Sequence, residues 1–369
     1  MVFKCEKCNL AWYYPVKKCI YCKGVVKELK EEKYRVRGIT EVFVPSKDHS
    51  QVPYYDLLLE DENDNLHIKK SFKKYEIGDV ILTDNKKKEE HIKEKIGVIG
   101  TGVTGTGIAQ VLVSAGFEVI LKSRTQESLD SAIQKIEREL LRTMSVSEKN
   151  KIIKNIKPTT NLDDLINADI IIESVTENIN VKKQLFKELD EILPDKAIIA
   201  TNTSSLSIDE LASATARPDR FIGMHFFNPV PKMYLLEIVR GEKTSDTIID
   251  KITKLAKQIN KTPIITKNSP CFIVNRILAA YLNEAIWELY EGVASAEDID
   301  TASKLGLNHP MGPLALVDLI SLDIVLAILK SLHQRTGDKK YLPCPLIEEK
   351  VKEGKLGRKT KEGFYKYIT

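Results

Sequence analysis

Residues 96–105 read IGVIGTGVTG, in which a short apolar run leads directly into Gly100-Thr101-Gly102-Val103-Thr104-Gly105, and a helical pattern follows up to Gly116. A G-x-G-x-x-G motif is weak evidence alone, but between a buried strand and a helix it indicates a dinucleotide-binding turn. Gly100 permits the tight turn, Gly102 lets the backbone approach a pyrophosphate, and Gly105 allows close packing of helix and strand. The stretch predicts cofactor contacts from Gly100, Gly102, Val103, Thr104 and Gly105. A plain glycine-rich turn is the alternative.

Apolar runs continue beyond this motif. They are short and nearly continuous, as expected of strands buried on both faces of a parallel sheet. The runs are Val119–Leu121, Ile170–Ile172, Ala197–Ala200 and Phe221–Met224. After residue 268 helical spacing replaces them, at Ile273–Tyr290, Ala296–Leu305 and Gly312–Leu332. The pattern predicts an α/β domain with a Rossmann-type, doubly wound sheet over 95–267 and an all-α domain over 268–369.

The end of the second predicted strand bears on the choice of cofactor. Glu118–Lys122 is followed by Ser123 and Arg124, at the place where an NAD enzyme usually presents a carboxylate to the adenosine ribose. A hydroxyl and a guanidinium can instead bind a 2′-phosphate. We therefore predict that Ser123 and Arg124 favour NADP(H), with NAD(H) as the second choice. The alternative is that Arg124 is a solvated charge at a strand end.

Four of the six cysteines lie near the amino terminus as two Cys-x-x-Cys pairs, Cys5 with Cys8 and Cys19 with Cys22. In a reducing compartment such a grouping indicates a metal, because disulfides are rare there. Four thiolates suffice for one tetrahedral Zn²⁺. An iron S₄ site and an unmetallated redox pair are the alternatives. We predict a zinc ribbon over residues 1–28.

Short β segments separated by polar turns follow the cysteines. They are Tyr34–Val36, Glu41–Val44, Tyr54–Leu59 and Val80–Leu82. Short strands separated by polar turns are typical of a small β-sandwich or barrel, so we predict an OB-like β domain over 29–84. The charge-dense run from Asp84 to Glu90 predicts a solvated linker over 85–94.

Bulk composition excludes several classes of protein. The 369 residues are enough for two or three compact units, and 43% hydrophobic with 29% charged residues is ordinary globular composition. The net charge of +4 gives no general reason to expect nucleic acid as a partner and suits small anionic ligands. We recognise no signal peptide and no bilayer-spanning run, so we expect a cytoplasmic protein.

Three polar motifs follow the predicted sheet strands. They are NTSS at 202–205, MHFFNP at 224–229 with Glu237 beyond it, and PCFIVNR at 270–276. A serine twenty-one residues before His225 and a glutamate twelve after it are not general Rossmann features. Over residues 95–367 the chain resembles the 3-hydroxyacyl-CoA dehydrogenase family, particularly its bacterial 3-hydroxybutyryl-CoA branch. Cys271 and Ser321 stand where the family usually has glycine.

The resemblance implies a role for each of four residues. His225 is the acid/base, Glu237 orients it, and Ser204 and Asn275 bind substrate oxygens. The chemistry independently requires these types, because alcohol oxidation needs a base near neutral pH and a carboxylate can fix the imidazole tautomer. Each also has a structural alternative: His225 as a hydrogen-bonded core residue, Glu237 as a solvent-facing charge, Ser204 as the cap of a helix beginning near Ser207, and Asn275 as a buried helix contact.

The resemblance also implies cofactor contacts from Glu177, Lys182 and Asn202, a homodimer formed by the helical domain, and (S)-3-hydroxyacyl-CoA dehydrogenase activity on short chains. A dehydrogenase of another hydroxy acid and a noncatalytic acyl-CoA-binding scaffold are the alternatives.

The amino-terminal segment resembles the zinc-ribbon and OB-fold proteins that accompany acyl-CoA enzymes such as thiolases. That resemblance rests on the cysteine spacing, Val52-Pro53-Tyr54 and Ile77–Val80. It implies docking to a thiolase or another acyl-CoA enzyme, with nucleic-acid binding as the alternative.

Overall fold

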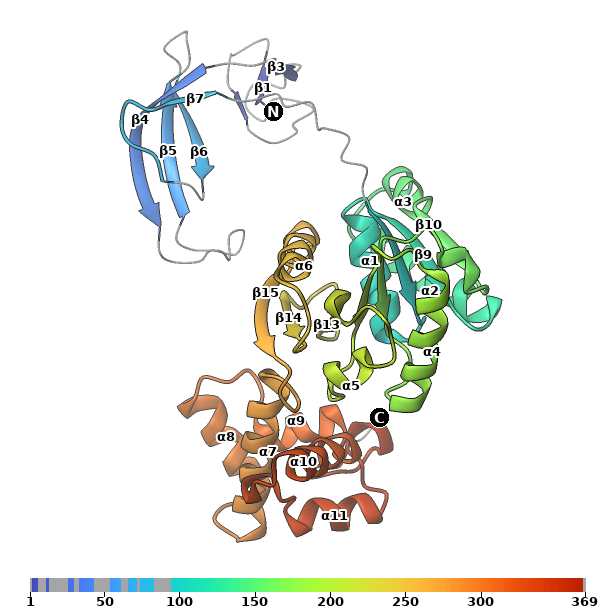
Figure 1. Ribbon diagram of the computed structural model, residues 1–369. Helices are drawn as coiled ribbons and strands as arrows, with labels where there is room; N and C mark the ends of the chain where they lie inside the picture. Colours follow the sequence, from blue (N-terminus) through green and yellow to red (C-terminus); the bar gives the residue numbers. More distant parts are fainter. Residues whose placement is uncertain are drawn as a thin grey trace. The chain divides into compact units, whose positions relative to one another are not determined.

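The computed structural model describes residues 2–5, 11–12, 26–29, 33–42, 54–60, 66–71, 74–82 and 94–367. The chain divides into two compact units, Met1–Ile92 and Lys93–Thr369 (Figure 1). The predicted doubly wound domain and the helical domain both belong to the second unit.

The first unit contains two small antiparallel sheets, with strand orders β2-β1-β3 and β6-β5-β4-β7. The strands are β1 Val2–Cys5, β2 Ala11–Trp12, β3 Val26–Leu29, β4 Lys33–Val42, β5 Tyr54–Glu60, β6 Leu66–Ser71 and β7 Val80–Leu82. Val36, Leu57, Leu59 and Ile81 form a buried core. The prediction of two strands within residues 34–44 was wrong, because β4 is one strand with a register shift between Val36 and Gly38. A bulge of this kind bends a strand without ending it.

Most of the predicted zinc site lies outside the described residues. Cys8, Cys19 and Cys22 are not described, and Cys5 is described only as the last residue of β1. The pair Val52-Pro53 and nearly all of the predicted linker also lie outside them. Within the described ranges no group of three or more His, Cys, Asp or Glu residues could hold a metal ion. The zinc ribbon and the OB-like barrel therefore stay predictions.

An eight-stranded sheet organises the second unit, in the order β10-β9-β8-β11-β12-β13-β14-β15. Its strands are β8 Lys95–Ile99, β9 Glu118–Lys122, β10 Ile156–Thr159, β11 Ile170–Glu173, β12 Ile198–Thr201, β13 Phe221–Phe226, β14 Leu235–Arg240 and β15 Thr262–Lys267. From β10 to β13 all neighbours are parallel, and their order is that of a doubly wound dinucleotide-binding sheet. The predicted Rossmann-type sheet is thereby confirmed. β13 and β14 are antiparallel, which the sequence patterns did not indicate.

Helices cover both faces of this sheet. They are α1 Val103–Ser114, α2 Gln126–Leu141, α3 Val146–Ile153, α4 Ile179–Ile192, α5 Ile208–Ala212 and α6 Asp246–Gln258. Successive strand residues point to opposite faces: Ile170 and Ile172 join one apolar core with α1, α2 and α6, whereas Ile171 joins the other with α4 and α5. Two cores on one sheet explain why β11 is apolar at every position before its last.

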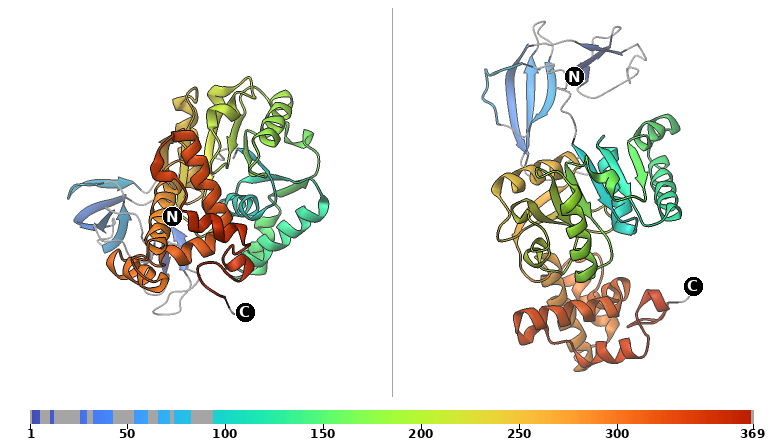
Figure 2. Two further views of the ribbon diagram at one scale, coloured as in Figure 1. Left: turned by 90° about the horizontal axis from the view of Figure 1, so that it is seen from below. Right: turned by 45° about the vertical axis from the view of Figure 1, so that its right-hand side comes forward.

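The helical domain comprises α7 Val274–Tyr290, α8 Ala296–Gly306, α9 Pro313–Ile320, α10 Leu322–Thr336 and α11 Pro345–Lys352, and it has its own apolar core. Figure 2 shows it beside the sheet domain, and Arg335 of α10 donates to the Ser205 carbonyl just before α5. A single helix over 312–332 was predicted, and this is wrong. The helix breaks at Ser321, whose φ of 101° lies outside the helical region.

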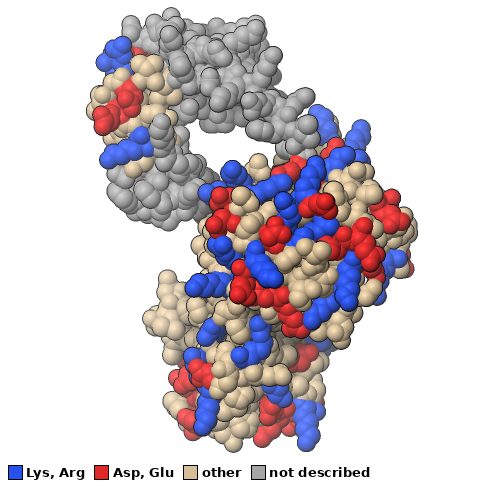
Figure 3. All heavy atoms as spheres, in the orientation of Figure 1, with Lys and Arg blue, Asp and Glu red and all other residues tan. Residues whose placement is uncertain are grey.

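Two further features of this unit are its surface charge and the character of its helices. Basic and acidic side chains are interspersed over the sheet domain on the face that Figure 3 shows. No described helix has both the length and the apolar character that crossing a membrane requires.

Candidate active site

The glycine motif forms a tight turn between β8 and α1. Gly100 has a φ of +112°, and a side chain there would overlap the carbonyl oxygen of Ser174. At Gly105 a side chain would overlap the Gly100 carbonyl. Gly102, by contrast, has no neighbouring atom within 4 Å of the place a Cβ would occupy. Two glycines are therefore required by the fold, whereas the third leaves open space at the amino end of α1, where an anionic group is favoured.

A cavity of about 940 Å³ begins at this turn. Its lining residues come from the glycine motif, the end of β9 and α4, and they include Gly100, Gly102, Ser123, Arg124 and Gln184. The Ser123 hydroxyl lies 2.9 Å from that of Thr101, and Arg124 is exposed. Ser123 and Arg124, which are predicted to determine cofactor preference, therefore both line this cavity.

A second cavity of about 270 Å³ continues from the first, because Gly102, Ser174 and Val175 line both. It is lined by Gly102, Val103, Thr104, Ser174, Val175, Glu177, Asn202, Ser204, His225, Phe226 and Asn228. Seven of the fourteen predicted catalytic and cofactor-binding residues are therefore brought together here. Together the two cavities extend from the glycine turn to the imidazole of His225.

His225 and Glu237 are register partners on the antiparallel strands β13 and β14. Nδ1 of His225 lies 2.7 Å from Oε2 of Glu237. The histidine is 5% exposed and the glutamate 0%, so Glu237 is not a solvent-facing charge. If Nδ1 carries the proton shared with the carboxylate, Nε2 is a free acceptor on the cavity side.

The other carboxylate oxygen of Glu237 is held by the helical domain. Its Oε1 accepts the backbone N–H groups of Ile273 and Val274, at 3.1 and 2.9 Å. These amides are aimed by two consecutive residues with positive φ, Cys271 at 58° and Phe272 at 57°. Such conformations are unusual for residues other than glycine and cluster at functional sites. The orientation of Glu237 is therefore fixed from both domains.

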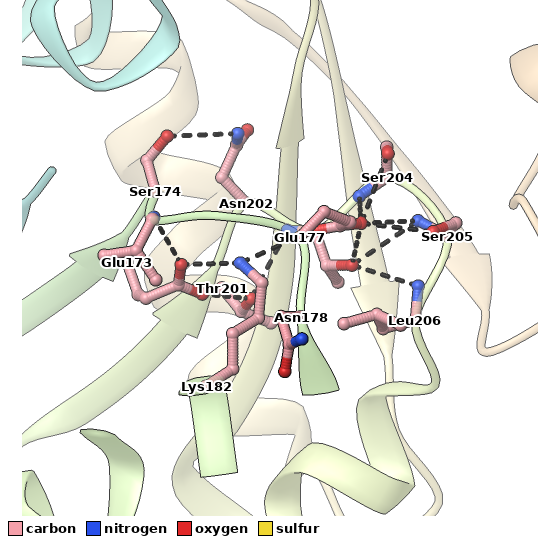
Figure 4. A network of polar contacts seen from close by, with 12 residues as sticks. Glu173, Ser174, Glu177, Asn178, Lys182, Thr201, Asn202, Ser204, Ser205 and Leu206 are labelled. Atoms are coloured by element: carbon pink, nitrogen blue, oxygen red, sulfur yellow. Dashed lines mark hydrogen bonds and ion pairs between the residues drawn. The ribbon is translucent and has the colours of Figure 1, made fainter. Parts of the chain in front are cut away.

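Glu177 holds the loop that carries Ser204 (Figure 4). Its Oε1 accepts the Thr203 hydroxyl at 2.6 Å and the amides of Ser204 and Ser205 at 2.9 and 3.2 Å. Burial opposes ionisation of Glu177, but Lys182 and these hydrogen bonds outweigh it and lower its pKa below 4.5. Ser204 does not cap α5. Ser207 does, by accepting the Glu210 amide.

Asn202 ties two strand ends together at the cavity. Its Oδ1 accepts the backbone amide of Phe226 at 2.9 Å, and its amide group lies 3.4 Å from the Ser174 hydroxyl. Opposite, the side chains of Thr104 and Asn228 are hydrogen bonded at 2.9 Å. The walls of the cavity are therefore cross-linked between segments far apart in sequence.

Lys182 and Asn275 line neither of these two cavities. Lys182 is 1% exposed, and its Nζ lies 2.6 Å from Oε1 of Glu173 and 3.4 Å from Oε2 of Glu177. Asn275, on the first turn of α7, instead lines a small apolar hollow. Lys182 thus lies behind Glu177, whereas Asn275 follows Val274, whose amide binds the carboxylate paired with His225.

Sequence reasoning missed Glu173. This residue ends β11, is 0% exposed, and binds Lys182 and the Thr201 hydroxyl. A charged residue directly after the apolar run Ile170–Ile172 was the available signal, but a charge at a strand end is ordinarily solvated.

Comparison with known proteins gives a consistent result. The family model for the "3-hydroxyacyl-CoA dehydrogenase, NAD binding domain" matches residues 95–269, and that for the C-terminal domain of the same family matches residues 272–367. A 3-hydroxybutyryl-CoA dehydrogenase of Clostridioides difficile is 50% identical over 278 residues, covering 74% of this chain and 99% of the relative. The human mitochondrial hydroxyacyl-coenzyme A dehydrogenase is 41% identical over 293 residues, covering 75% and 92%.

Solved structures agree. The crystal structure of (S)-3-hydroxybutyryl-CoA dehydrogenase from Ralstonia eutropha superposes with a TM-score of 0.74 at 45% identity, covering 75% of this chain and 100% of that one.

Proposed function

This chain belongs to the 3-hydroxyacyl-CoA dehydrogenase family, and we propose that it interconverts short (S)-3-hydroxyacyl-CoA and 3-ketoacyl-CoA thioesters, such as 3-hydroxybutyryl-CoA and acetoacetyl-CoA. The observation that carries the proposal is the His225–Glu237 pair, held at the far end of a cavity that begins at the glycine turn. This oxidation requires a proton carrier next to a dinucleotide site, and the two adjoining cavities provide both.

The residues at the cavity fit a nicotinamide dinucleotide. The open position at Gly102 admits a pyrophosphate at the amino end of α1, and the larger cavity has room for the adenosine. Gly100, Val103, Thr104 and Asn202 would support it along the same path, whereas Gly105 packs against the Gly100 carbonyl behind it. When bound, the nicotinamide ring accepts or donates the hydride.

In our proposal His225 moves the proton. During oxidation Nε2 accepts the proton of the substrate hydroxyl, and Glu237 stabilises the resulting imidazolium through its bond to Nδ1. In the reverse direction the imidazolium donates to the developing alkoxide. Ser204 is placed at the same cavity to bind the substrate oxygen. Asn275 follows Val274, whose backbone amide binds Glu237, and from the first turn of α7 it would bind a substrate oxygen.

We also propose that NADP(H) is preferred to NAD(H). The end of β9 presents the Ser123 hydroxyl and the exposed Arg124 to the larger cavity. No carboxylate stands at either position to repel a 2′-phosphate, and a guanidinium binds phosphate by charge-assisted hydrogen bonds.

Steady-state assays with acetoacetyl-CoA and NADPH, in wild type and His225→Ala, test the activity. We expect turnover in wild type and a loss of about 10²–10⁴-fold in the variant. Turnover of another hydroxy acid with none of the thioester would favour a different dehydrogenase. Binding of acetoacetyl-CoA without any turnover would favour a noncatalytic scaffold.

Assembly is a further part of the proposal. We propose a homodimer formed by the helical domain, where Ile277 of α7 is 66% and Ile324 of α10 48% exposed. Exposed apolar side chains on neighbouring helices are typical of interfaces. Sedimentation analysis of wild type and Ile277→Asp tests this, since the charged variant is expected to dissociate.

For the amino-terminal unit we propose a cytoplasmic zinc ribbon and OB-like module that docks a thiolase or another acyl-CoA enzyme. Four clustered thiols in two Cys-x-x-Cys pairs support the metal. Elemental analysis is expected to give about one zinc per chain, and iron would reassign the site. Deleting residues 1–90 is expected to abolish thiolase binding and to leave turnover of free substrate intact.

A further inference from the structure

A buried ion pair lies directly behind the cavity wall. Glu173, the last residue of β11, is 0% exposed and Lys182, on the first turns of α4, is 1% exposed. Nζ of Lys182 lies 2.6 Å from Oε1 of Glu173. Charged groups are rarely buried so completely, because desolvation costs more than one attraction returns unless further hydrogen bonds help.

Those further bonds reach two segments of the site. Glu173 accepts the backbone amide of Val175 at 2.6 Å and the Thr201 hydroxyl at 2.7 Å. Val175 lines both cavities, and Thr201 ends the strand that leads to Ser204. The buried carboxylate therefore joins the loop after β11 to the end of β12.

Lys182 connects the buried Glu173 to Glu177, which lines the smaller cavity. Its Nζ lies 3.4 Å from Oε2 of Glu177, while Oε1 of Glu177 accepts from Thr203, Ser204 and Ser205. Figure 4 shows the Glu177 carboxylate between the lysine and the 204–206 loop. One cation thus lies between a buried carboxylate and a carboxylate that faces the cavity.

We propose that Glu173 and Lys182 are positioning residues, which act through Glu177 to set where Ser204 stands relative to His225. The proposal rests on the proposed function. Among the described residues Lys182 is the cation within ion-pair distance of Glu177. Its loss removes the support that holds this carboxylate under the loop, so the amides of Ser204 and Ser205 lose a fixed acceptor. Misplacement of a reacting contact by about 1 Å costs roughly a hundredfold in rate.

Three variants of the full-length protein separate positioning from simple stability. Lys182→Met leaves the buried Glu173 carboxylate without its cation, so the urea midpoint of the variant is expected to fall. The double variant Glu173→Gln/Lys182→Met leaves no buried charge and is expected to recover most of that midpoint. Lys183→Met is the matched control, because Lys183 is the next residue on α4 and its ion pair with Glu210 is partly exposed, with side-chain exposures of 31% and 55%.

Two readouts decide the question. Amide hydrogen exchange of residues 203–206 is expected to accelerate in Lys182→Met and in the double variant, but not in Lys183→Met. With acetoacetyl-CoA and NADPH, kcat is expected to stay roughly ten- to a hundredfold low in the double variant although its stability has recovered, with a smaller change in KM.

A double variant that regains both stability and kcat, with normal exchange of the loop, would overturn the proposal and leave the pair a purely structural one. Glu177→Gln keeps the buried pair intact and gives a second check, because it is expected to show the same faster exchange. If wild type itself shows no turnover, the proposed function fails, whereas the exchange measurements still decide whether the pair holds the loop.

Discussion

His225 and Glu237 face each other as direct register partners across β13 and β14, with Nδ1 and Oε2 2.7 Å apart. Paired positions of an antiparallel ladder keep their side chains on the same face at a fixed separation. The sheet therefore holds the imidazole and its carboxylate at hydrogen-bonding distance before any substrate binds, and the amides of Ile273 and Val274 fix the carboxylate from behind.

Glu237→Gln is expected to lower kcat by roughly 10²–10⁴-fold. The amide cannot stabilise the imidazolium and can favour the wrong tautomer of His225. Steady-state kinetics with acetoacetyl-CoA measure the effect, and Glu242→Gln, an exposed glutamate just after β14, is the control. A change of less than about threefold would contradict the orienting role.

Gly102→Ala and Gly105→Ala are expected to fail in different ways. A methyl group at Gly102 meets no protein atom within 4 Å, so thermal unfolding of the free protein stays near that of wild type while NADPH binding weakens. At Gly105 the methyl group would overlap the Gly100 carbonyl, and this should cost about 1–3 kcal/mol of stability. Unimpaired NADPH binding by Gly102→Ala would argue against a pyrophosphate at this turn.

Ser123→Asp is expected to shift cofactor preference towards NADH. A carboxylate at the end of β9 repels a 2′-phosphate and binds the ribose hydroxyls of NADH. The ratio of kcat/KM for NADPH to that for NADH should fall by roughly tenfold or more. Arg142→Ala, at the end of α2, serves as the control, because the Arg142 guanidinium is exposed and pairs with Glu139 on the same helix. A wild type that already prefers NADH would refute the predicted preference.

Cys271 is expected to resist alkylation in the native protein. Burial raises the pKa of its thiol to about 11, although Arg335 and Arg276 partly oppose the shift. Since the thiolate is the nucleophile, labelling by iodoacetamide at pH 8 should be slow and should speed up as pH rises or when urea unfolds the chain. Peptide mass spectrometry measures this, and labelling as fast as that of a free cysteine would contradict the burial.

Glu177 is expected to add stability that acid removes. Its pKa is lowered below 4.5, because Lys182 and the hydroxyl and amide donors outweigh burial. A carboxyl group with a lowered folded-state pKa contributes fully above its unfolded value and loses the contribution as pH falls through the folded value. In urea titrations the difference between wild type and Glu177→Gln should be largest near neutrality and shrink below pH 4. A constant difference would show that ionisation is not its origin.

Local sequence determined the dinucleotide fold. The glycine turn, the apolar runs buried on both faces and the helical spacing after residue 268 each depend on neighbours within a few residues, so the doubly wound sheet and the helical domain could be predicted. Family resemblance supplied His225 and Glu237 as partners. The strand that carries Glu237 was missed, because LLEIVR has no regular alternation.

Only the tertiary structure decided the rest. The register that sets Glu237 opposite His225 joins residues twelve apart, and the burial of Lys182 against Glu173 depends on how α4 packs on β11. The break at Ser321 is not written in a local pattern either. The conformational preferences of residues close in sequence determine where strands and helices form. Which charged side chains come into contact depends instead on desolvation and on packing between segments distant in sequence.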